Sequence, residues 1–235
     1  MQVQNNAPEA GTLQTLSDRF PEFWMLGVSA VAWLALAAWT GRHIHFAGVA
    51  ANWWHWMLMV TAMMLPLQIQ GVRLTAERSL WPRRNRAIAW FLLGYLSVWA
   101  LAGALLSWIV LVLSIPLRFG WMEGAAIGLF LETAWLISPW KRVAARQCHR
   151  TLPLSPTGWR ADRDCLGYGW IAGCGCALNC WPLMLVCWLS GHSFIAMVVA
   201  FGLAWADRHA TPNYTLHAMV AGVLGAAFGV LSWVR

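Results

Sequence analysis

Charged residues are scarce in this chain: they make up 11% of its 235 residues, and only nine of them are acidic. An average soluble domain has about 25% charged and about 45–50% apolar residues, whereas 60% of this chain is hydrophobic. A water-soluble fold of this size leaves too much surface exposed to hide so large an apolar share. The composition therefore excludes an ordinary soluble protein and predicts an integral membrane protein.

Signatures of common enzymes and of secretion are also missing. The sequence has no phosphate-binding glycine loop, no hydrolase nucleophile elbow and no Ser-His-Asp arrangement. Residues 1–22 are polar and carry acidic residues rather than a basic stretch, so we expect a cytoplasmic segment there instead of a cleavable signal peptide. These absences favour a protein that is not an enzyme, although they leave enzymatic activity open.

Apolar runs recur along the rest of the chain, at about the length of roughly 20 residues that a membrane-spanning helix needs. They lie at Phe23–Thr40, Ala47–Gln70, Ala87–Ser114, Phe119–Trp140, Leu166–Leu189, Ser193–Ala206 and Tyr214–Val234. The sixth run is short, so six spans are the alternative to seven. We expect residues 23–235 to form one all-α domain, a polytopic transmembrane helical bundle of about seven spans.

Basic residues are divided unequally between the two sides of this predicted bundle. Seven spans place thirteen Lys and Arg residues on one side and three on the other. Cytoplasmic loops carry such an excess, so we expect a cytoplasmic N-terminus and basic cytoplasmic loops at 71–86 and 141–165, in a bacterial inner membrane. The net charge of +7 then sets topology and contacts anionic lipid. The lipid bilayer is the expected partner, and no nucleic acid is expected.

Polar and sulfur side chains follow one face of the second predicted span. They are spaced by three or four residues, at Asn52, His55, Met59, Met63, Pro66 and Gln70. Polar residues within a span face the bundle interior, so we expect this face to be buried and Trp53 and Trp56 to point away from it. Packing alone is the other interpretation, because Met fills gaps and His or Asn hydrogen-bonds to neighbouring helices.

The fifth predicted span holds four of the six cysteines within fourteen residues. A stripe of sulfur atoms is formed by Cys176, Cys180, Met184 and Cys187, which are spaced by four, four and three residues. On a regular helix Cys174 lies opposite, although the adjacent glycines and a proline favour local unwinding. Thiolate and thioether donors are soft and favour Cu(I). Free cysteine as a small buried apolar residue is the other interpretation.

The second and fifth spans run in opposite directions, which brings their sulfur atoms to one level in the inner half of the membrane. Glu132 of the fourth span lies at a similar depth, where it would neutralise a bound cation, take up a proton or pair with a loop arginine. The predicted metal ligands are His55, Met59, Met63, Cys174, Cys176, Cys180, Met184 and Glu132.

A second cluster of candidate ligands lies in the basic segment before the fifth span. Cys148, His149 and Cys165 occur there, with Asp162 and Asp164 nearby. They suggest a capture site that delivers an ion to the thiols. The cysteines lack the paired spacing of a structural zinc site.

Four blocks of sequence resemble an uncharacterised bacterial family described as predicted metal-binding integral membrane proteins. The blocks are Trp54–Pro66, Leu93–Trp99, Ser138–Lys141 with Cys148–Arg150, and Gly173–Met184. They occur in the family's order over most of residues 50–210. The resemblance implies a metal-binding function and a multi-pass membrane fold.

Three functions therefore remain open at the level of sequence. The first is a membrane protein that binds, delivers or transports a soft metal ion between the second and fifth spans, with copper as the expected metal. The second is a non-catalytic subunit or assembly factor of a larger membrane complex, with other membrane subunits as partners. The third is a thiol-redox enzyme whose cysteines cycle through disulfides.

Overall fold

The computed structural model describes residues 23–40, 49–113, 120–148, 150–155, 157–209 and 213–234. These residues form helices and no strand. The helices are α2 (Phe23–Thr40), α3 (Val49–Met64), α4 (Ile69–Glu77), α5 (Arg84–Leu113), α6 (Trp121–Ile137), α7 (Pro139–Cys148), α8 (Gly158–Leu189), α9 (Phe194–His209) and α10 (Tyr214–Trp233), with 3-10 turns η1 (Pro66–Gln68) and η2 (Trp81–Arg83). Each of the seven apolar runs contains a helix, so the all-α prediction is confirmed.

Three helical segments are long and apolar enough to cross a bilayer, namely Trp81–Ile109, α8 and α10. A fourth is obtained when α3 is combined with the η1–α4 segment, although the two parts are bent by 44°. The bend lies at Pro66, which lacks the N–H group that a continuous helix needs. The remaining apolar helices are shorter, with 18 residues in α2, 17 in α6 and 16 in α9. The seven-span count and the orientation of the termini stay predictions.

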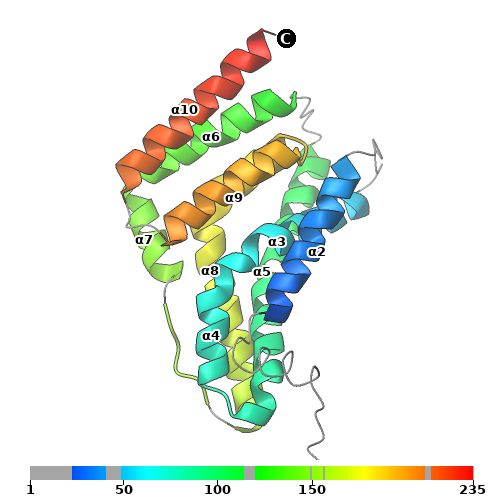
Figure 1. Ribbon diagram of the computed structural model, residues 1–235, viewed down its shortest axis with the longest axis vertical. Coiled ribbons are helices and arrows are strands. Elements are labelled where there is room, and N and C mark those ends of the chain that lie inside the picture. Colours follow the sequence, from blue (N-terminus) through cyan, green and yellow to red (C-terminus); the bar gives the residue numbers. More distant parts are fainter. Residues whose placement is uncertain are drawn as a thin grey trace, which may run out of the picture.

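Helix α8 lies at the centre of the architecture, with α5 packed along it and α6, α7 and α9 also in contact with it (Figure 1). Glycine permits the close approach of α5 and α8. A Cβ atom on Gly169 would lie 1.9 Å from the Phe91 carbonyl oxygen, and one on Gly94 would lie 2.2 Å from the Leu166 carbonyl oxygen. Helix α10 packs against α6, and α2 packs against α3. This arrangement leaves α8 with a different neighbour on each side.

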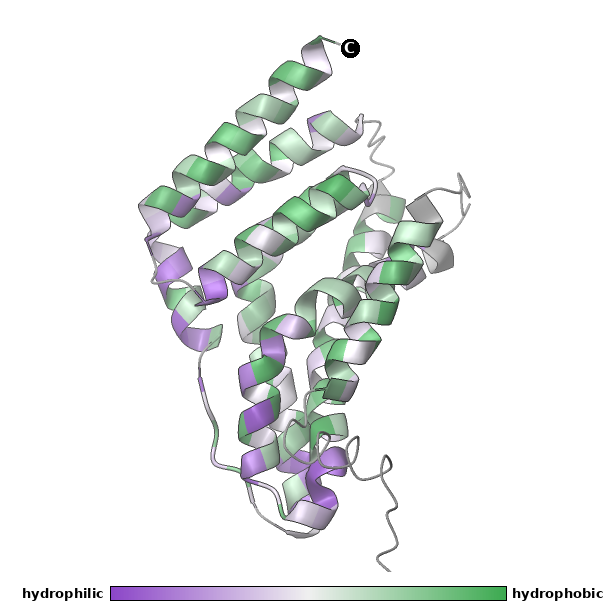
Figure 2. Cartoon of the chain, viewed as in Figure 1, coloured by the Kyte–Doolittle hydropathy of each residue, from purple (hydrophilic) through white to green (hydrophobic). Residues whose placement is uncertain are grey.

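Hydrophilic residues gather on α4, on α7 and at the adjoining ends of the long helices (Figure 2). Where α5 and α8 begin, Arg83 and Arg86 each bind the Asp162 carboxylate at 2.6 Å. Helix α4 extends the second apolar run as far as Glu77, and α7 begins at Pro139. Both basic segments therefore contain helix where the sequence suggested loops.

Candidate metal centre

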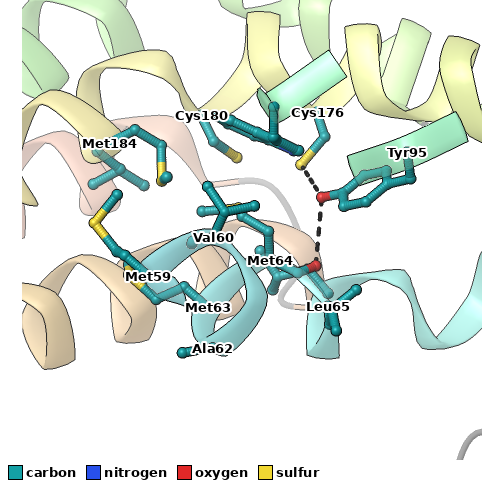
Figure 3. Close-up of a cluster of buried hydrophobic side chains, with 14 of the residues drawn as sticks. Met59, Val60, Ala62, Met63, Met64, Leu65, Tyr95, Cys176, Cys180 and Met184 are labelled. Atoms are coloured by element: carbon teal, nitrogen blue, oxygen red, sulfur yellow. Dashed lines mark hydrogen bonds between the residues drawn. The ribbon is translucent and has the colours of Figure 1, made fainter. Parts of the chain in front are cut away.

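Seven sulfur side chains line the interface between α3 and α8. They are all at most 4% exposed, and they are Met59, Met63 and Met64 of α3 and Cys176, Cys180, Met184 and Cys187 of α8. We call this set the sulfur row. Figure 3 shows that the sulfur atoms of Cys176, Cys180 and Met184 follow one another along α8, opposite the methionines of α3. The regular spacing in the sequence places Met59 and Met63 of α3 and the four residues of α8 on buried faces, as predicted, and Met64 is buried as well.

One direct contact and one bridging hydroxyl connect the two helices at opposite ends of the sulfur row. The Cys187 Sγ atom lies 3.9 Å from the Met63 Sδ atom. The hydroxyl of Tyr95 on α5 lies 3.2 Å from the Cys176 Sγ atom and 3.4 Å from the Met64 carbonyl oxygen (Figure 3). Tyr95 is fully buried, so its hydroxyl links α3, α5 and α8 within the core.

Cys148, at the end of α7, was assigned to the separate capture site but lies next to Cys176. The approach depends on Gly175, where a Cβ atom would come within 2.9 Å of the Cys148 Cα and N atoms. The Cys176 thiol hydrogen-bonds to Cys148 and lowers the pKa of the Cys148 thiol, burial opposes this effect, and the Arg208 charge lowers the pKa further, to about 7. Arg208 of α9 also donates a hydrogen bond to the Cys148 Sγ atom. A buried thiol that readily forms a thiolate therefore adjoins the sulfur row.

A buried ionic cluster lies on the side of α8 that faces α7 and α9. The ammonium group of Lys141 donates to the Asp207 carboxylate at 2.9 Å and to the Asn179 carbonyl oxygen at 3.2 Å. The Asn179 side-chain amide donates to Asp207 at 2.9 Å and to the Cys180 Sγ atom at 3.6 Å. Burial disfavours the charged form of Lys141, but Asp207 and Glu132 outweigh it and raise the pKa of Lys141. Asn179 thereby connects the ionic cluster to the sulfur row.

The donors of the sulfur row have a chemistry that suits a soft ion. Among the residues that the structure describes, no group of three or more His, Cys, Asp and Glu side chains is arranged to hold a metal ion. The soft donors close to one another here are cysteine thiols and methionine thioethers, and such donors favour Cu(I) over hard cations.

A family model described as a copper chaperone, PpoB2, matches residues 53–232, which include the whole sulfur row. The chain belongs to this copper chaperone family. The match supports a copper-related function, in agreement with the metal-binding function that the sequence resemblance implied. No curated protein and no solved structure matches the chain.

In this member of the copper chaperone family, three of the predicted ligands lie away from the sulfur row. Cys174 is half-buried and lies about 200° around α8 from Cys176, at about 100° per residue. Glu132 is 1% exposed and its charge acts on Lys141, so it belongs with the ionic cluster. His55 lies at the far end of the row, against His192.

The prediction that Trp53 and Trp56 point away from the bundle is wrong. Trp56 is 5% exposed, and its indole N–H donates to the Trp99 carbonyl oxygen at 2.9 Å. Trp53 is half-buried and donates in the same way to the Ala100 carbonyl oxygen at 3.0 Å. An indole N–H in apolar surroundings needs an acceptor, and the backbone of α5 supplies one. Burial of the predicted polar face is wrong for its two ends, because Asn52 and Gln70 are exposed. Met59, Met63 and Pro66 of that face are buried, and His55 is half-buried.

The proposed capture site before α8 is not assembled in the described residues. Asp162 is bound by two arginines, and Asp164 accepts a hydrogen bond from the Ser155 N–H at 3.1 Å. Cys165 lies eleven residues before Cys176 on α8, or about 16 Å at 1.5 Å per residue, whereas Cys148 is beside Cys176. His149, which was also assigned to the capture site, lies outside the described residues.

Proposed function

We propose that this chain is a multi-pass membrane copper chaperone that holds Cu(I) between α3 and α8. Cys176 and Cys180 supply the thiolates, and Met63 or Met59 supplies a thioether. The observation that carries the proposal is the sulfur row, in which soft donors from two helices face one another in a buried interface. Membership of a copper chaperone family supports the choice of metal.

The ionic cluster supplies the electrostatic conditions for such a site. Copper binds thiolates rather than thiols, so binding releases protons and is favoured by groups that stabilise the deprotonated sulfur. Arg208 contacts Cys148 directly, and the Lys141–Asp207–Asn179 cluster reaches Cys180 through the Asn179 amide. A Cu(I) ion bound by two thiolates has a net negative charge, which the nearby cations offset.

The proposal includes an orientation in the inner membrane with seven spans and a cytoplasmic N-terminus. Helix α8 has 32 residues and is about 48 Å long at 1.5 Å per residue, which exceeds a hydrocarbon core of about 30 Å. Its first turns, with Asp162 and the arginines bound to it, would then project into the cytoplasm. A reporter inserted near Arg84 should be cytoplasmic and one after Arg235 external. An external Arg84 reporter would overturn this orientation.

Copper affinity of the detergent-purified protein tests the proposed function. Loaded anaerobically, the wild type should retain Cu(I) in the sulfur row in competition with a chromogenic Cu(I) chelator. The double variant Cys176→Ser with Cys180→Ser keeps the side-chain size but removes the soft thiolates, and its affinity should fall by at least tenfold, or about 1.4 kcal/mol. Glu132→Gln should weaken binding less, because a carboxylate is a hard ligand.

Cys165→Ser is the matched control, because Cys165 is buried on the same helix but lies outside the sulfur row. It should bind copper as tightly as the wild type. If the double serine variant also retains wild-type affinity, the thiols are structural and the complex-subunit function becomes the better proposal.

The contact between Cys148 and Cys176 favours one second candidate, a thiol-redox function. A thiolate attacks a disulfide through a mixed-disulfide intermediate, and Cys148 has the lowered pKa that this chemistry requires. Oxidised glutathione would then convert Cys148 and Cys176 to a disulfide, with reduction of glutathione. Peptide mapping by mass spectrometry after this treatment separates the two candidates, because a copper chaperone does not require that bond.

A further inference from the structure

Two histidines from distant parts of the sequence meet at the end of the sulfur row that is farthest from Cys148. His55 lies on α3, and His192 lies in the turn between α8 and α9. Their ring centroids are 4.7 Å apart, with the ring planes inclined at 60°. The Nε2 atom of His192 is shielded from solvent and has no hydrogen-bond partner among the described residues. Buried polar nitrogen atoms are normally satisfied, so this one calls for an explanation.

The backbone holds His192 in a conformation that few residues adopt. Both Gly191 and His192 have φ of +60°, in the left-handed region, which is uncommon for a residue other than glycine. The His192 N–H donates to the Cys187 carbonyl oxygen at 2.8 Å, and the Gly191 N–H donates to the Trp188 carbonyl oxygen at 3.1 Å. These bonds fix the imidazole directly beyond the last turn of α8. The unusual φ therefore sets the position of the ring next to His55.

We propose that His55 and His192 form a second copper site, from which the ion passes to or from the sulfur row. The proposal rests on the proposed function of that row. Imidazole nitrogen suits copper, and two rings contributed by different elements bring two such donors together. A bound ion would also satisfy the His192 Nε2 atom. The histidine pair would bind copper through nitrogen, whereas the cysteines near Cys148 would bind it through sulfur.

The positions of the donors along the helices support a path between the two sites. Helix α8 continues for thirteen residues after Cys176, to Leu189, or about 20 Å at the helical rise, and His192 follows in the next turn. This length is about two thirds of a hydrocarbon core of about 30 Å. Sulfur atoms occur at nearly every turn between them, at Cys180, Met184 and Cys187. Met59 lies one turn from His55 on α3. A soft ion would therefore meet a donor at each step across the membrane.

Copper stoichiometry and copper-edge X-ray absorption of the full chain test this proposal. The wild type, saturated anaerobically with Cu(I), should bind about two ions and show both nitrogen and sulfur scattering. The double variant His55→Gln with His192→Asn should bind about one ion with sulfur scattering alone. Asn tolerates a positive φ, so the turn should persist, and thermal unfolding of this variant should resemble that of the wild type.

His217→Gln is the control for loss of a half-buried histidine elsewhere, on α10, and it should retain both ions. The variant Cys176→Ser with Cys180→Ser should lose the sulfur-bound ion and keep the nitrogen-bound one. Retention of both ions by the double histidine variant would overturn the proposal, as would a wild type that binds a single ion with sulfur scattering alone. A wild type with a nitrogen-bound ion and no sulfur-bound ion would instead contradict the proposed function.

Discussion

Two sides of helix α8 contact different parts of the molecule and carry different kinds of residue. The side toward α3 carries the sulfur row, in which the neighbours are methionines and apolar groups. The side toward α7 and α9 carries a buried Lys141–Asp207 ion pair, and Arg208 is in contact with Cys148. Soft neutral donors thus lie on one side of the thiols, and groups that stabilise a thiolate lie on the other.

This difference gives a role to the position of Cys176 and Cys180, the two cysteines of the sulfur row that adjoin the ionic side of α8. Methionines alone would offer donors without charge, and they would leave the positive charge of Cu(I) uncompensated in a medium of low dielectric constant. The Lys141–Asp207 pair and Arg208 alone would stabilise thiolates but would provide no thioether ligand for a soft ion. Cys176 and Cys180 contact both regions, through Tyr95 and Cys148 in one case and through Asn179 in the other. The predictions below perturb one side at a time, beginning with the largest effect.

Lys141→Met should destabilise the protein more than any other single change considered. The Lys141 side chain is fully buried and that of Asp207 is 7% exposed, and removal of one partner from a buried pair costs about 3–5 kcal/mol because the other charge is left unpaired. Thermal unfolding in detergent should show a large fall in Tm. The neighbouring exposed change Arg142→Met should alter stability by no more than about 0.5 kcal/mol.

The double variant Lys141→Met with Asp207→Leu separates charge balance from packing. Replacement of both members of a buried pair by apolar residues is often nearly neutral, so this variant should regain most of the stability. If it unfolds as readily as Lys141→Met, the ion pair does not account for the loss.

Gly175→Ala should disturb the contact between α7 and α8 at an intermediate level. A Cβ atom at this position would meet the Cys148 backbone at 2.9 Å, and overpacking of this kind costs about 1–3 kcal/mol. The helices must then separate, so hydrogen bonding between Cys148 and Cys176 should weaken and copper affinity should fall. Gly167→Ala on the same helix meets nothing within 4 Å and should gain about 0.5–1 kcal/mol from helix propensity. Equal effects of the two substitutions on unfolding would contradict the close contact.

The sulfur row was predictable from the sequence because periodicity alone places Cys176, Cys180, Met184 and Cys187 on one face of a helix. The length of the apolar runs located the apolar helices. The periodicity argument failed for Trp56, because apolar residues on both sides of α3 are buried and a polarity difference no longer indicates which side faces a neighbour. A helix at a surface has one apolar face, which indicates the buried side. A helix that is buried on two sides lacks this contrast between an apolar and a polar face.

The ionic side could not be predicted, because its residues come from segments that lie between apolar runs. Lys141 and Cys148 lie on α7, and Asp207 and Arg208 lie near the end of α9. Their sequence spacing does not show which helix they contact. That contact depends on the close approach at Gly175, a consequence of how whole helices dock. His192 was missed for a related reason, because its position follows from backbone conformation in a turn.

Arg208→Gln should change the reactivity of Cys148 without removing a sulfur atom. The pKa of Cys148 is lowered to about 7, so roughly half of it is thiolate at pH 7, the form that reacts with iodoacetamide. Loss of the Arg208 charge should raise this pKa, so the pH profile of alkylation should shift to higher pH and the rate at pH 7 should fall severalfold. Arg146→Gln, an exposed change on α7, should leave the profile in place. An unshifted profile for Arg208→Gln would show that the arginine does not stabilise the thiolate.

Tyr95→Phe should have the smallest effect, and it tests whether the sulfur side depends on a polar link. The Tyr95 hydroxyl lies between Cys176 and the Met64 carbonyl oxygen at 3.2 and 3.4 Å, and one hydrogen bond contributes about 0.5–1.5 kcal/mol. The ring remains packed against Phe91, whose centroid is 6.5 Å away. The free energy of unfolding should therefore fall by no more than the contribution of this hydrogen bond. Copper stoichiometry should stay unchanged, because the hydroxyl is not a soft donor. A loss of bound copper with little change in stability would instead show that the hydroxyl positions the Cys176 sulfur for the ion.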